Sequence, residues 1–147
     1  MNIKTIIIAD DDPDDKEFFD AAVKEINPSV KIFNVPNGKE LMRLLDSFVP
    51  DMVFLDLDMP VMNGVESLVA IRANANLEKM PVVVYSSTTR EANIQTAYEM
   101  GAHLFFIKPS VYQDYLNSLR AILRLNWRDP AAVREQYCVN NRYTAFA

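Results

Sequence analysis

Five short apolar runs, separated by stretches with the period of a helix, constrain this chain most. The runs are Thr5–Ala9, Val30–Val35, Met52–Leu55, Pro81–Tyr85 and Leu104–Ile107. Their shortness and their β-branched and aromatic residues are typical of buried strands. Between and after them, apolar residues recur at helical spacing, as in Phe18–Ile26 and Tyr112–Leu123. The alternation predicts an α/β domain with a five-stranded parallel sheet and helices on both faces.

Composition and punctuation agree with one such domain. The 147 residues suffice for one core and a short extension, and the 50% hydrophobic content is ordinary for a globular protein. Asp12 followed by Pro13 has the pattern of a helix N-cap with proline at the first helical position. Thr88 and Glu91 have the spacing of a capping box, which predicts that the fourth helix starts at Thr88.

Charge and cysteine content exclude several classes of function. The net charge is -5 and there is no Lys/Arg run, which argues against nucleic-acid binding through bulk electrostatics. No apolar stretch is long enough to span a membrane, and the N-terminus lacks the pattern of a secretory signal. The single cysteine, Cys138, cannot form an internal disulfide. We therefore expect a cytoplasmic protein.

Chemically active residues follow four of the five predicted strands. They are Asp10, Asp11 and Asp12 after the first strand, Asp56 and Asp58 at the end of the third, Ser86 after the fourth and Lys108 after the fifth. Ligands of open α/β sheets bind outside the carboxyl ends of the strands. Each of these residues alone has an ordinary explanation as a cap or a loop residue, and we expect Asp12 to be only a cap. Their gathering at one edge indicates a site.

The residue types at this edge suit phosphoryl chemistry. Clustered carboxylates repel each other unless a cation neutralises them, and Mg²⁺ prefers carboxylate oxygens while keeping waters for a phosphate. A hydroxyl and a lysine can bind phosphoryl oxygens. A carboxylate can also act as the nucleophile and form an aspartyl-phosphate.

The motifs in this order resemble those of a bacterial two-component response regulator. Over roughly residues 3–126, the chain is similar to the single-domain receivers of the CheY-like and phytochrome type. The matching segments are Ile6–Asp15, Val53–Pro60 with Met62–Gly64, Val82–Ser87 and Lys108–Pro109. The resemblance implies a flavodoxin-like (βα)5 fold with strand order 2-1-3-4-5. Residues 1–126 would form the receiver domain.

The resemblance also implies a role for each site residue. Asp56 would accept the phosphoryl group, and Ser86 and Lys108 would bind its oxygens. Mg²⁺, with Mn²⁺ as a substitute, would be held by Asp10, Asp11, Asp56 and the backbone carbonyl of Asp58. The Lys108–Pro109 bond would be cis.

The same resemblance predicts how a phosphorylated state would be transmitted. Ser86 and Phe105 would be the switch residues, although Phe105 could equally be a core residue. The face of the fourth helix, fifth strand and fifth helix would change shape, and the residues expected on it are Ile94, Tyr98, Phe105, Tyr112 and Tyr115.

A receiver of this kind implies particular partners. The donor would be a histidine kinase or a histidine phosphotransfer protein, and phytochrome-like kinases are one such source. The chain would not be an enzyme toward other substrates; it would catalyse its own phosphoryl transfer and slow autodephosphorylation. With no output domain expected after residue 126, it would act by docking, by relaying phosphate or by dimerising through the switching face or the tail.

The tail, residues 127–147, is rich in aromatic residues, which is unusual for a disordered end. Residues 131–137 could form a short helix after Pro130. We expect the tail to serve docking or dimerisation, packed on its own domain or on a second subunit.

Two other interpretations stay open at this point. Asp56-Leu57-Asp58 is also the Asp-x-Asp pattern of haloacid-dehalogenase-type phosphatases. In those enzymes, however, the acidic pair follows this motif, whereas Asp10 and Asp11 precede it here. The second alternative is a pseudo-receiver that serves only as a scaffold, which the presence of every expected acid and of Lys108 disfavours.

Overall fold

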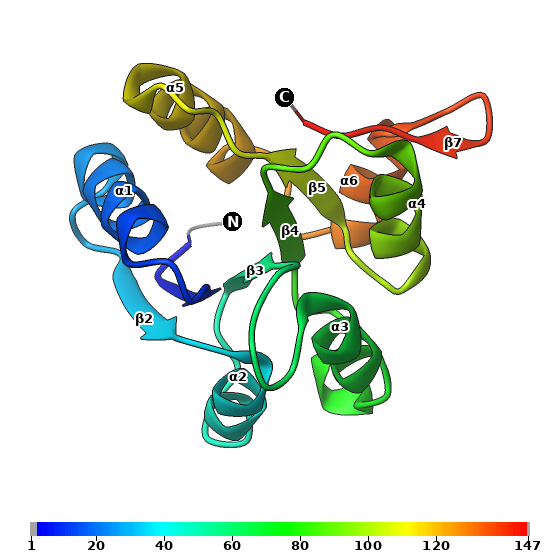
Figure 1. Ribbon diagram of the computed structural model, residues 1–147, viewed down its shortest axis with the longest axis horizontal. Helices are drawn as coiled ribbons and strands as arrows, with labels where there is room; N and C mark the ends of the chain where they lie inside the picture. The colour runs from blue at the N-terminus through cyan, green and yellow to red at the C-terminus, as the bar shows by residue number, and fades with distance from the viewer. Residues whose placement is uncertain (1–2, 147) are drawn as a thin grey trace.

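A single parallel sheet organises the protein in the computed structural model, which describes residues 3–146. Its strand order is β2-β1-β3-β4-β5, with β2 at one edge (Figure 1). The strands are β1 (Thr5–Ala9), β2 (Lys31–Val35), β3 (Met52–Asp56), β4 (Val82–Ser86) and β5 (Leu104–Ile107). The fold class and the strand order expected from the sequence are confirmed.

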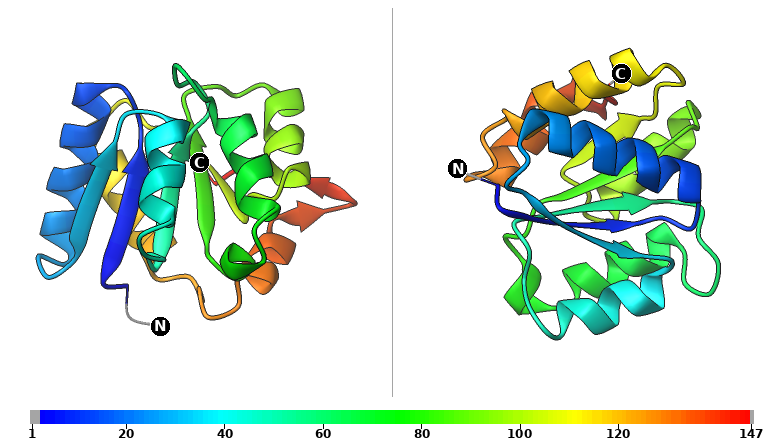
Figure 2. Two further views of the ribbon diagram at one scale, coloured as in Figure 1. Left: turned by 90° about the horizontal axis from the view of Figure 1, so that it is seen from below. Right: turned by 90° about the vertical axis from the view of Figure 1, so that its left-hand side faces the viewer.

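Helices cover both faces of this sheet. They are α1 (Pro13–Ile26), α2 (Gly38–Leu45), α3 (Gly64–Arg72), the 3-10 helix η1 (Ala75–Leu77), α4 (Glu91–Glu99) and α5 (Tyr112–Leu123). α1 and α5 lie together on one face, and α2, α3 and α4 lie on the other (Figures 1 and 2). Side chains alternate along each strand, so Phe105 enters the core beneath α4 whereas Phe106 enters the core beneath α5.

The helices are too short to cross a bilayer. The longest, α1, has 14 residues, whereas a span needs about 20 apolar residues. Within residues 3–146, no helix combines the length and the apolar character of a membrane span.

One predicted helix start is confirmed and the other is wrong. The Asp12 side chain accepts a hydrogen bond from the Asp14 N–H, and Pro13 is the first residue of α1. The fourth helix, however, begins at Glu91 rather than at Thr88. The Thr88 hydroxyl instead accepts a hydrogen bond from the Arg90 N–H over 3.2 Å. This local turn competes with helix formation, which explains the later start.

The predicted cis bond before Pro109 is also wrong. No peptide bond of residues 3–146 is cis, so Lys108–Pro109 is trans. The trans isomer is favoured intrinsically by about 0.5–1 kcal/mol. The Lys108 N–H donates to the Ser86 carbonyl, and the Lys108 side chain reaches the acidic residues with this isomer. The contacts of Lys108 therefore do not require a cis bond.

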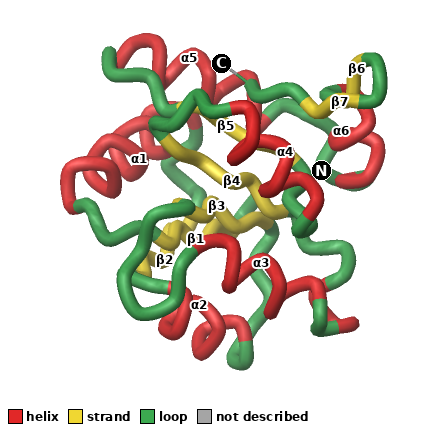
Figure 3. The backbone as a smooth tube through the Cα atoms, turned by 45° about the vertical axis from the view of Figure 1, so that its right-hand side comes forward, coloured by secondary structure: helices red, strands yellow, loops and turns green. Residues whose placement is uncertain are grey.

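The tail folds onto the domain through one helix and one hairpin. Helix α6 (Pro130–Gln136) is followed by β6 (Cys138–Val139) and β7 (Arg142–Tyr143), beside α4 and β5 (Figure 3). Asn140 and Asn141 connect the two strands with φ values of 53° and 63°, the left-handed conformation that two-residue hairpin turns need. Trp127, which precedes α6, is only 2% exposed and packs in the core beneath α5. The tail thus shares the core of the domain.

The end of the tail covers the free edge of β5. Phe146 donates its N–H to the Phe105 carbonyl over 2.7 Å and accepts from the Ile107 N–H over 3.0 Å. The Tyr98 hydroxyl donates to the Thr144 carbonyl over 2.8 Å. The two bonds of Phe146 occupy backbone groups that the edge strand β5 would otherwise offer to another chain.

This packing corrects the expected switching face. We expected it to present five side chains, but four of them are at most 5% exposed and the fifth, Tyr112, is half-buried. The buried four are Ile94, Tyr98, Phe105 and Tyr115. Tyr98 is covered because its ring stacks on Tyr143 of β7 at a centroid distance of 4.6 Å. A partner approaching Tyr98 or the edge of β5 would therefore contact the tail.

Candidate functional site

Three carboxylates meet at the carboxyl edge of the sheet. Asp10 follows β1 and Asp56 ends β3, and these strands are paired neighbours in the sheet. One carboxylate oxygen from each of Asp10, Asp11 and Asp56 lies within 4.8 Å of the others. Asp10 is fully buried, Asp56 is 6% exposed and Asp11 is exposed to solvent. The cluster predicted from the sequence therefore exists and has one open side.

Lys108 brings a positive charge into this cluster from the end of β5. Its ammonium nitrogen lies 3.7 Å from Asp56 Oδ2 and 3.5 Å from Asp10 Oδ2. Its shortest contact, 2.6 Å, is with Oδ2 of Asp15 in the first turn of α1. Only 11% of the lysine side chain is exposed. The ammonium is thus shared among three acids.

Sequence analysis did not single out two residues of this site, Asp15 and Tyr85. The Tyr85 hydroxyl donates a hydrogen bond to Asp10 Oδ2 over 2.5 Å. The Lys108 ammonium lies 4.3 Å from the centre of its ring, within the range of a cation–π contact. A tyrosine in an apolar strand resembles a core residue, so the sequence gives no signal for this role. For Asp15 there is a signal, because it falls in the first turn of the helix that follows the acidic loop.

Burial and charge shift the pKa values of the clustered groups. Burial raises the pKa of Asp56 to about 7; the Lys108 charge opposes this rise and the Asp10 charge adds to it. For Asp10, burial also acts upward, but hydrogen bonds from Tyr85 and the Asp12 N–H, with the Lys108 charge, outweigh it and lower the pKa. Burial acts to lower the pKa of Lys108, but Asp15, Asp56 and Asp10 together raise it. Asp56 is therefore the carboxylate that gains most from a bound cation.

The loop after β3 holds the Asp56 side chain. The Asp58 N–H donates to Asp56 Oδ1 over 3.2 Å. Gly64 starts α3 so close to β3 that an added Cβ would collide with the Asp56 carbonyl oxygen. Val61 adopts a φ of 67°, a strained left-handed conformation for a β-branched residue. The expected role of the Asp58 carbonyl in metal binding stays a prediction.

Ser86 and Phe105 are the two residues expected to act as the switch. Ser86 follows Tyr85, the residue that pairs with Asp56 in the sheet, and is 2% exposed. Its hydroxyl oxygen accepts a hydrogen bond from the Thr88 N–H over 3.2 Å. Phe105 is fully buried, as its alternative assignment to the core required. The switch roles of Ser86 and Phe105 stay predictions.

The donor atoms fit a hard divalent cation. Every side-chain donor in the cluster is a carboxylate oxygen, and no histidine or cysteine joins it among the described residues. A set of carboxylate oxygens suits hard cations such as Mg²⁺ and Mn²⁺ better than the softer transition metals, which prefer nitrogen and sulfur ligands. The raised pKa of Asp56 agrees, because a bound cation would stabilise the carboxylate anion that burial, and to a smaller extent the charge of Asp10, disfavours.

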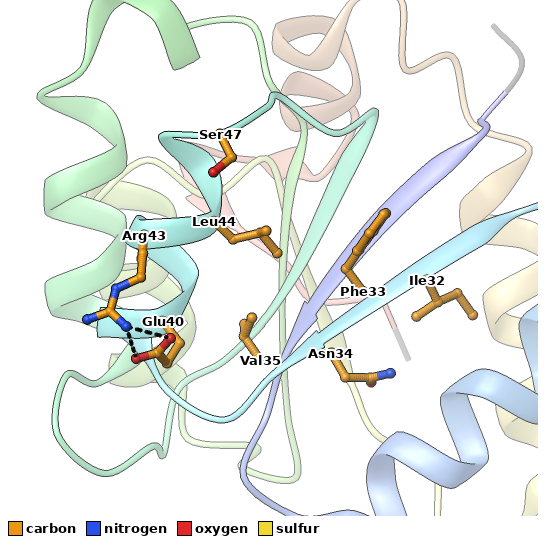
Figure 4. Close-up of a pocket in the computed structure, with 8 residues that line it drawn as sticks. All are labelled: Ile32, Phe33, Asn34, Val35, Glu40, Arg43, Leu44 and Ser47. Atoms are coloured by element: carbon orange, nitrogen blue, oxygen red, sulfur yellow. Dashed lines mark hydrogen bonds and ion pairs between the residues drawn. The ribbon is translucent and has the colours of Figure 1, made fainter.

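A separate pocket of about 520 Å³ lies between β2 and α2 (Figure 4). Its lining is mostly apolar, and its only charged side chains are Glu40 and Arg43. These two side chains form an ion pair, drawn with dashed lines in Figure 4, and their charged atoms lie 3.1 Å apart. The pocket therefore offers no free reactive group, and the acidic cluster is the stronger candidate site.

The sheet and its acidic edge place the protein in the class of doubly wound α/β domains that bind ligands at the carboxyl ends of their strands. Residues 6–120 match the response regulator receiver domain family, so the chain belongs to that family. It is therefore a receiver domain of two-component, phosphorelay signalling, and receiver domains interact with histidine kinases.

Relatives and solved structures agree with this assignment. The nitrate/nitrite response regulator protein NarL of Escherichia coli is 31% identical over 119 residues, which are 78% of this chain and 52% of NarL. The phosphorylated cyanobacterial phytochrome response regulator RcpA superimposes with a TM-score of 0.77 at 24% identity, covering 82% of this chain and 91% of RcpA. The chain spans only 25% to 52% of the length of several curated relatives that it matches.

A further structural neighbour is the receiver domain of a histidine kinase, solved with a bound metal ion. The receiver domain of the sensor histidine kinase PA1611 from Pseudomonas aeruginosa has a magnesium ion coordinated in its active-site cleft. It superimposes with a TM-score of 0.73 at 18% identity, covering 87% of this chain and all of that domain. At this identity, the likeness establishes the shared fold.

Proposed function

We propose that this protein accepts a phosphoryl group on Asp56 from the phosphohistidine of a histidine kinase or a histidine phosphotransfer protein. The observation that carries the proposal is the sharing of one ammonium, that of Lys108, between Asp10 and Asp56 beside an open acidic cluster. This arrangement offers a nucleophile, a cation site and a donor for phosphoryl oxygens at one place.

The transfer step needs little more than correct positioning. A carboxylate oxygen of Asp56 attacks the phosphorus, the phosphorus–nitrogen bond of the phosphohistidine breaks, and the released imidazole takes a proton from solvent. Lys108 and the Ser86 hydroxyl bind the phosphoryl oxygens, whose negative charge increases around the transferred group. Slow attack by water on the aspartyl-phosphate later releases inorganic phosphate and restores Asp56.

Mg²⁺ is the proposed cofactor, and Mn²⁺ is expected to substitute for it. Asp11 and Asp56 would bind it directly, with Asp10 and the Asp58 carbonyl completing the protein's contribution. When bound, the ion supplies positive charge that neutralises the carboxylates and the transferred phosphoryl group. Asp10 is already fixed by Tyr85, which keeps one wall of the cation site in place.

Phosphorylation would be transmitted through the strands next to Asp56. The added charge, about -1.5 to -2, would draw Ser86 and Lys108 toward the phosphoryl oxygens. Phe105 would respond through β5, whose free edge binds Phe146 of the tail. We propose that residues 127–147 act in docking or dimerisation at this face, in the cytoplasm, where a kinase donor would be met.

Acetyl phosphate with Mg²⁺ tests the proposed function. The intact mass of the protein is expected to rise by one phosphoryl group per chain. Asp56→Asn should abolish the rise because the amide is not a nucleophile for this step. Asp12→Asn is the matched control: the residue caps α1, and asparagine caps helices as well as aspartate does, so uptake should persist.

Two other outcomes would contradict the proposal. Absence of any mass increase, with a folded protein and bound metal, would indicate a scaffold that has lost the receiver reaction. Steady turnover of p-nitrophenyl phosphate would indicate a phosphatase of the aspartyl-phosphate type instead.

A further inference from the structure

The Lys108 ammonium has a closer partner than the proposed phosphoacceptor. Its contact with Asp15 Oδ2 measures 2.6 Å, whereas its distance to Asp56 Oδ2 is 3.7 Å. The short contact is a charge-assisted hydrogen bond, and the longer one is an ion pair beyond hydrogen-bonding distance.

The start of α1 fixes Asp15 in this place. Asp12 caps the helix and Pro13 occupies its first position. Asp14 and Asp15 then share the first turn, but only Asp15 faces the site: Asp14 is exposed to solvent, whereas Asp15 is half-buried. Within residues 3–146, Asp14 forms no ion pair with a lysine or arginine. The helix N-terminus accounts for an acid in this turn, but it does not account for the contact of Asp15 with Lys108.

The Lys108 ammonium is surrounded by groups that stabilise its charge. Asp15 binds it on one side, Asp10 lies 3.5 Å away, and the ring of Tyr85 lies beneath it at 4.3 Å. An ammonium has three donors and one charge. A move toward a phosphoryl group on Asp56 would therefore weaken the bond to Asp15.

We propose that Asp15 holds Lys108 in the unphosphorylated protein and competes with the phosphoryl group on Asp56 for this ammonium. Asp15 is thus a positioning residue that acts through Lys108 and disfavours the phosphorylated state. The proposal rests on the proposed function, because the competition exists only if Asp56 carries a phosphoryl group.

Beryllofluoride, a stable analogue of the phosphoryl group, tests this competition. Its Kd is measured by calorimetry at saturating Mg²⁺ for the wild type and for Asp15→Asn. The variant is expected to bind about three- to tenfold more tightly, since partly exposed ion pairs contribute up to about 1 kcal/mol and the like charge of Asp15 is removed as well. A merely structural role for Asp15 would not produce tighter binding.

Two further variants make the test specific. Asp14→Asn removes the same charge from the same helical turn without a contact to Lys108, and its Kd should stay within about twofold of the wild type. Asp15→Glu keeps a carboxylate within reach of Lys108, so its affinity should return toward the wild-type value. Melting curves by circular dichroism establish that each variant is folded.

The outcomes separate this proposal from the proposed function. If the wild type binds beryllofluoride but Asp15→Asn binds it equally or more weakly, the competition is refuted and the phosphoacceptor function stands. An equal gain in Asp14→Asn would also refute it, because the effect would then be general charge repulsion. If the wild type with bound Mg²⁺ does not bind beryllofluoride at all, both proposals are wrong.

Discussion

Asp56→Asn is expected to raise the free energy of unfolding by about 2–4 kcal/mol at about pH 8 without divalent cations. The pKa of Asp56 rises from 3.8 to about 7 on folding, chiefly through burial. Each unit of such a shift corresponds to about 1.36 kcal/mol, and the full shift sets the upper limit. Asn has nearly the same shape and carries no charge, so it removes the cost of burying an anion.

The pH dependence of this difference follows from the direction of the shift. Between about pH 4 and pH 7 the folded chain keeps a proton on Asp56 that the unfolded chain has lost. The wild type therefore loses stability relative to Asp56→Asn as the pH rises through this window. The gain from Asn should be largest above pH 7 and shrink as the pH falls toward 4. Urea unfolding of both proteins at several pH values measures it.

Divalent cations should reverse the comparison. At about 100 times its Kd, Mg²⁺ stabilises the protein that binds it by about 2.7 kcal/mol. The wild type should gain this stability, whereas Asp56→Asn, which lacks one carboxylate of the cluster, should gain less. A variant that is no more stable than the wild type at about pH 8 without metal would show that Asp56 is not held as a costly anion.

The second large effect is expected in the tail, where Trp127→Ala should lower the free energy of unfolding by about 3–5 kcal/mol. The side chain is 2% exposed, packs in the core beneath α5, and its indole N–H donates to the Ile122 carbonyl over 2.8 Å. Truncating a buried aromatic residue leaves a cavity of this cost. Urea unfolding followed by far-ultraviolet circular dichroism measures it without relying on tryptophan fluorescence.

The exposed hairpin of the tail supplies the control. Val139 is 53% exposed, so Val139→Ala should change stability by no more than about 0.5 kcal/mol. If Trp127 instead packed on a second subunit, Trp127→Ala would leave the monomer as stable as before and shift the oligomeric state in sedimentation. That pair of results would contradict the packing of the tail on its own domain.

The sheet was predictable because each strand has a local sequence pattern that identifies it. The runs Thr5–Ala9 and Leu104–Ile107 coincide with β1 and β5, since short β-branched and aromatic segments between helical patterns have few other folds available. The gathering of Asp10, Asp11 and Asp56 then followed from a topological rule about strand ends rather than from any local signal.

The differences between expectation and structure have one local and one long-range cause. The Thr88 hydroxyl could bond in a turn or in a helix cap, and the sequence alone does not decide between them. The burial of Tyr98 on the expected switching face was not foreseen, because Tyr143 and Phe146, far along the chain, cover Tyr98 and the edge of β5. The role of Tyr85 in the site was not predictable, because a tyrosine in a buried strand is expected to be a core residue.

Locating the modified residue tests the central claim most directly. After treatment with acetyl phosphate and Mg²⁺, borohydride reduction converts an aspartyl-phosphate to homoserine, and peptide sequencing by mass spectrometry identifies its position. Homoserine at position 56 alone is the predicted result. Homoserine at position 10, 11 or 15, or none anywhere in a protein that has gained a phosphoryl group, would contradict the assignment of Asp56 as the phosphoacceptor.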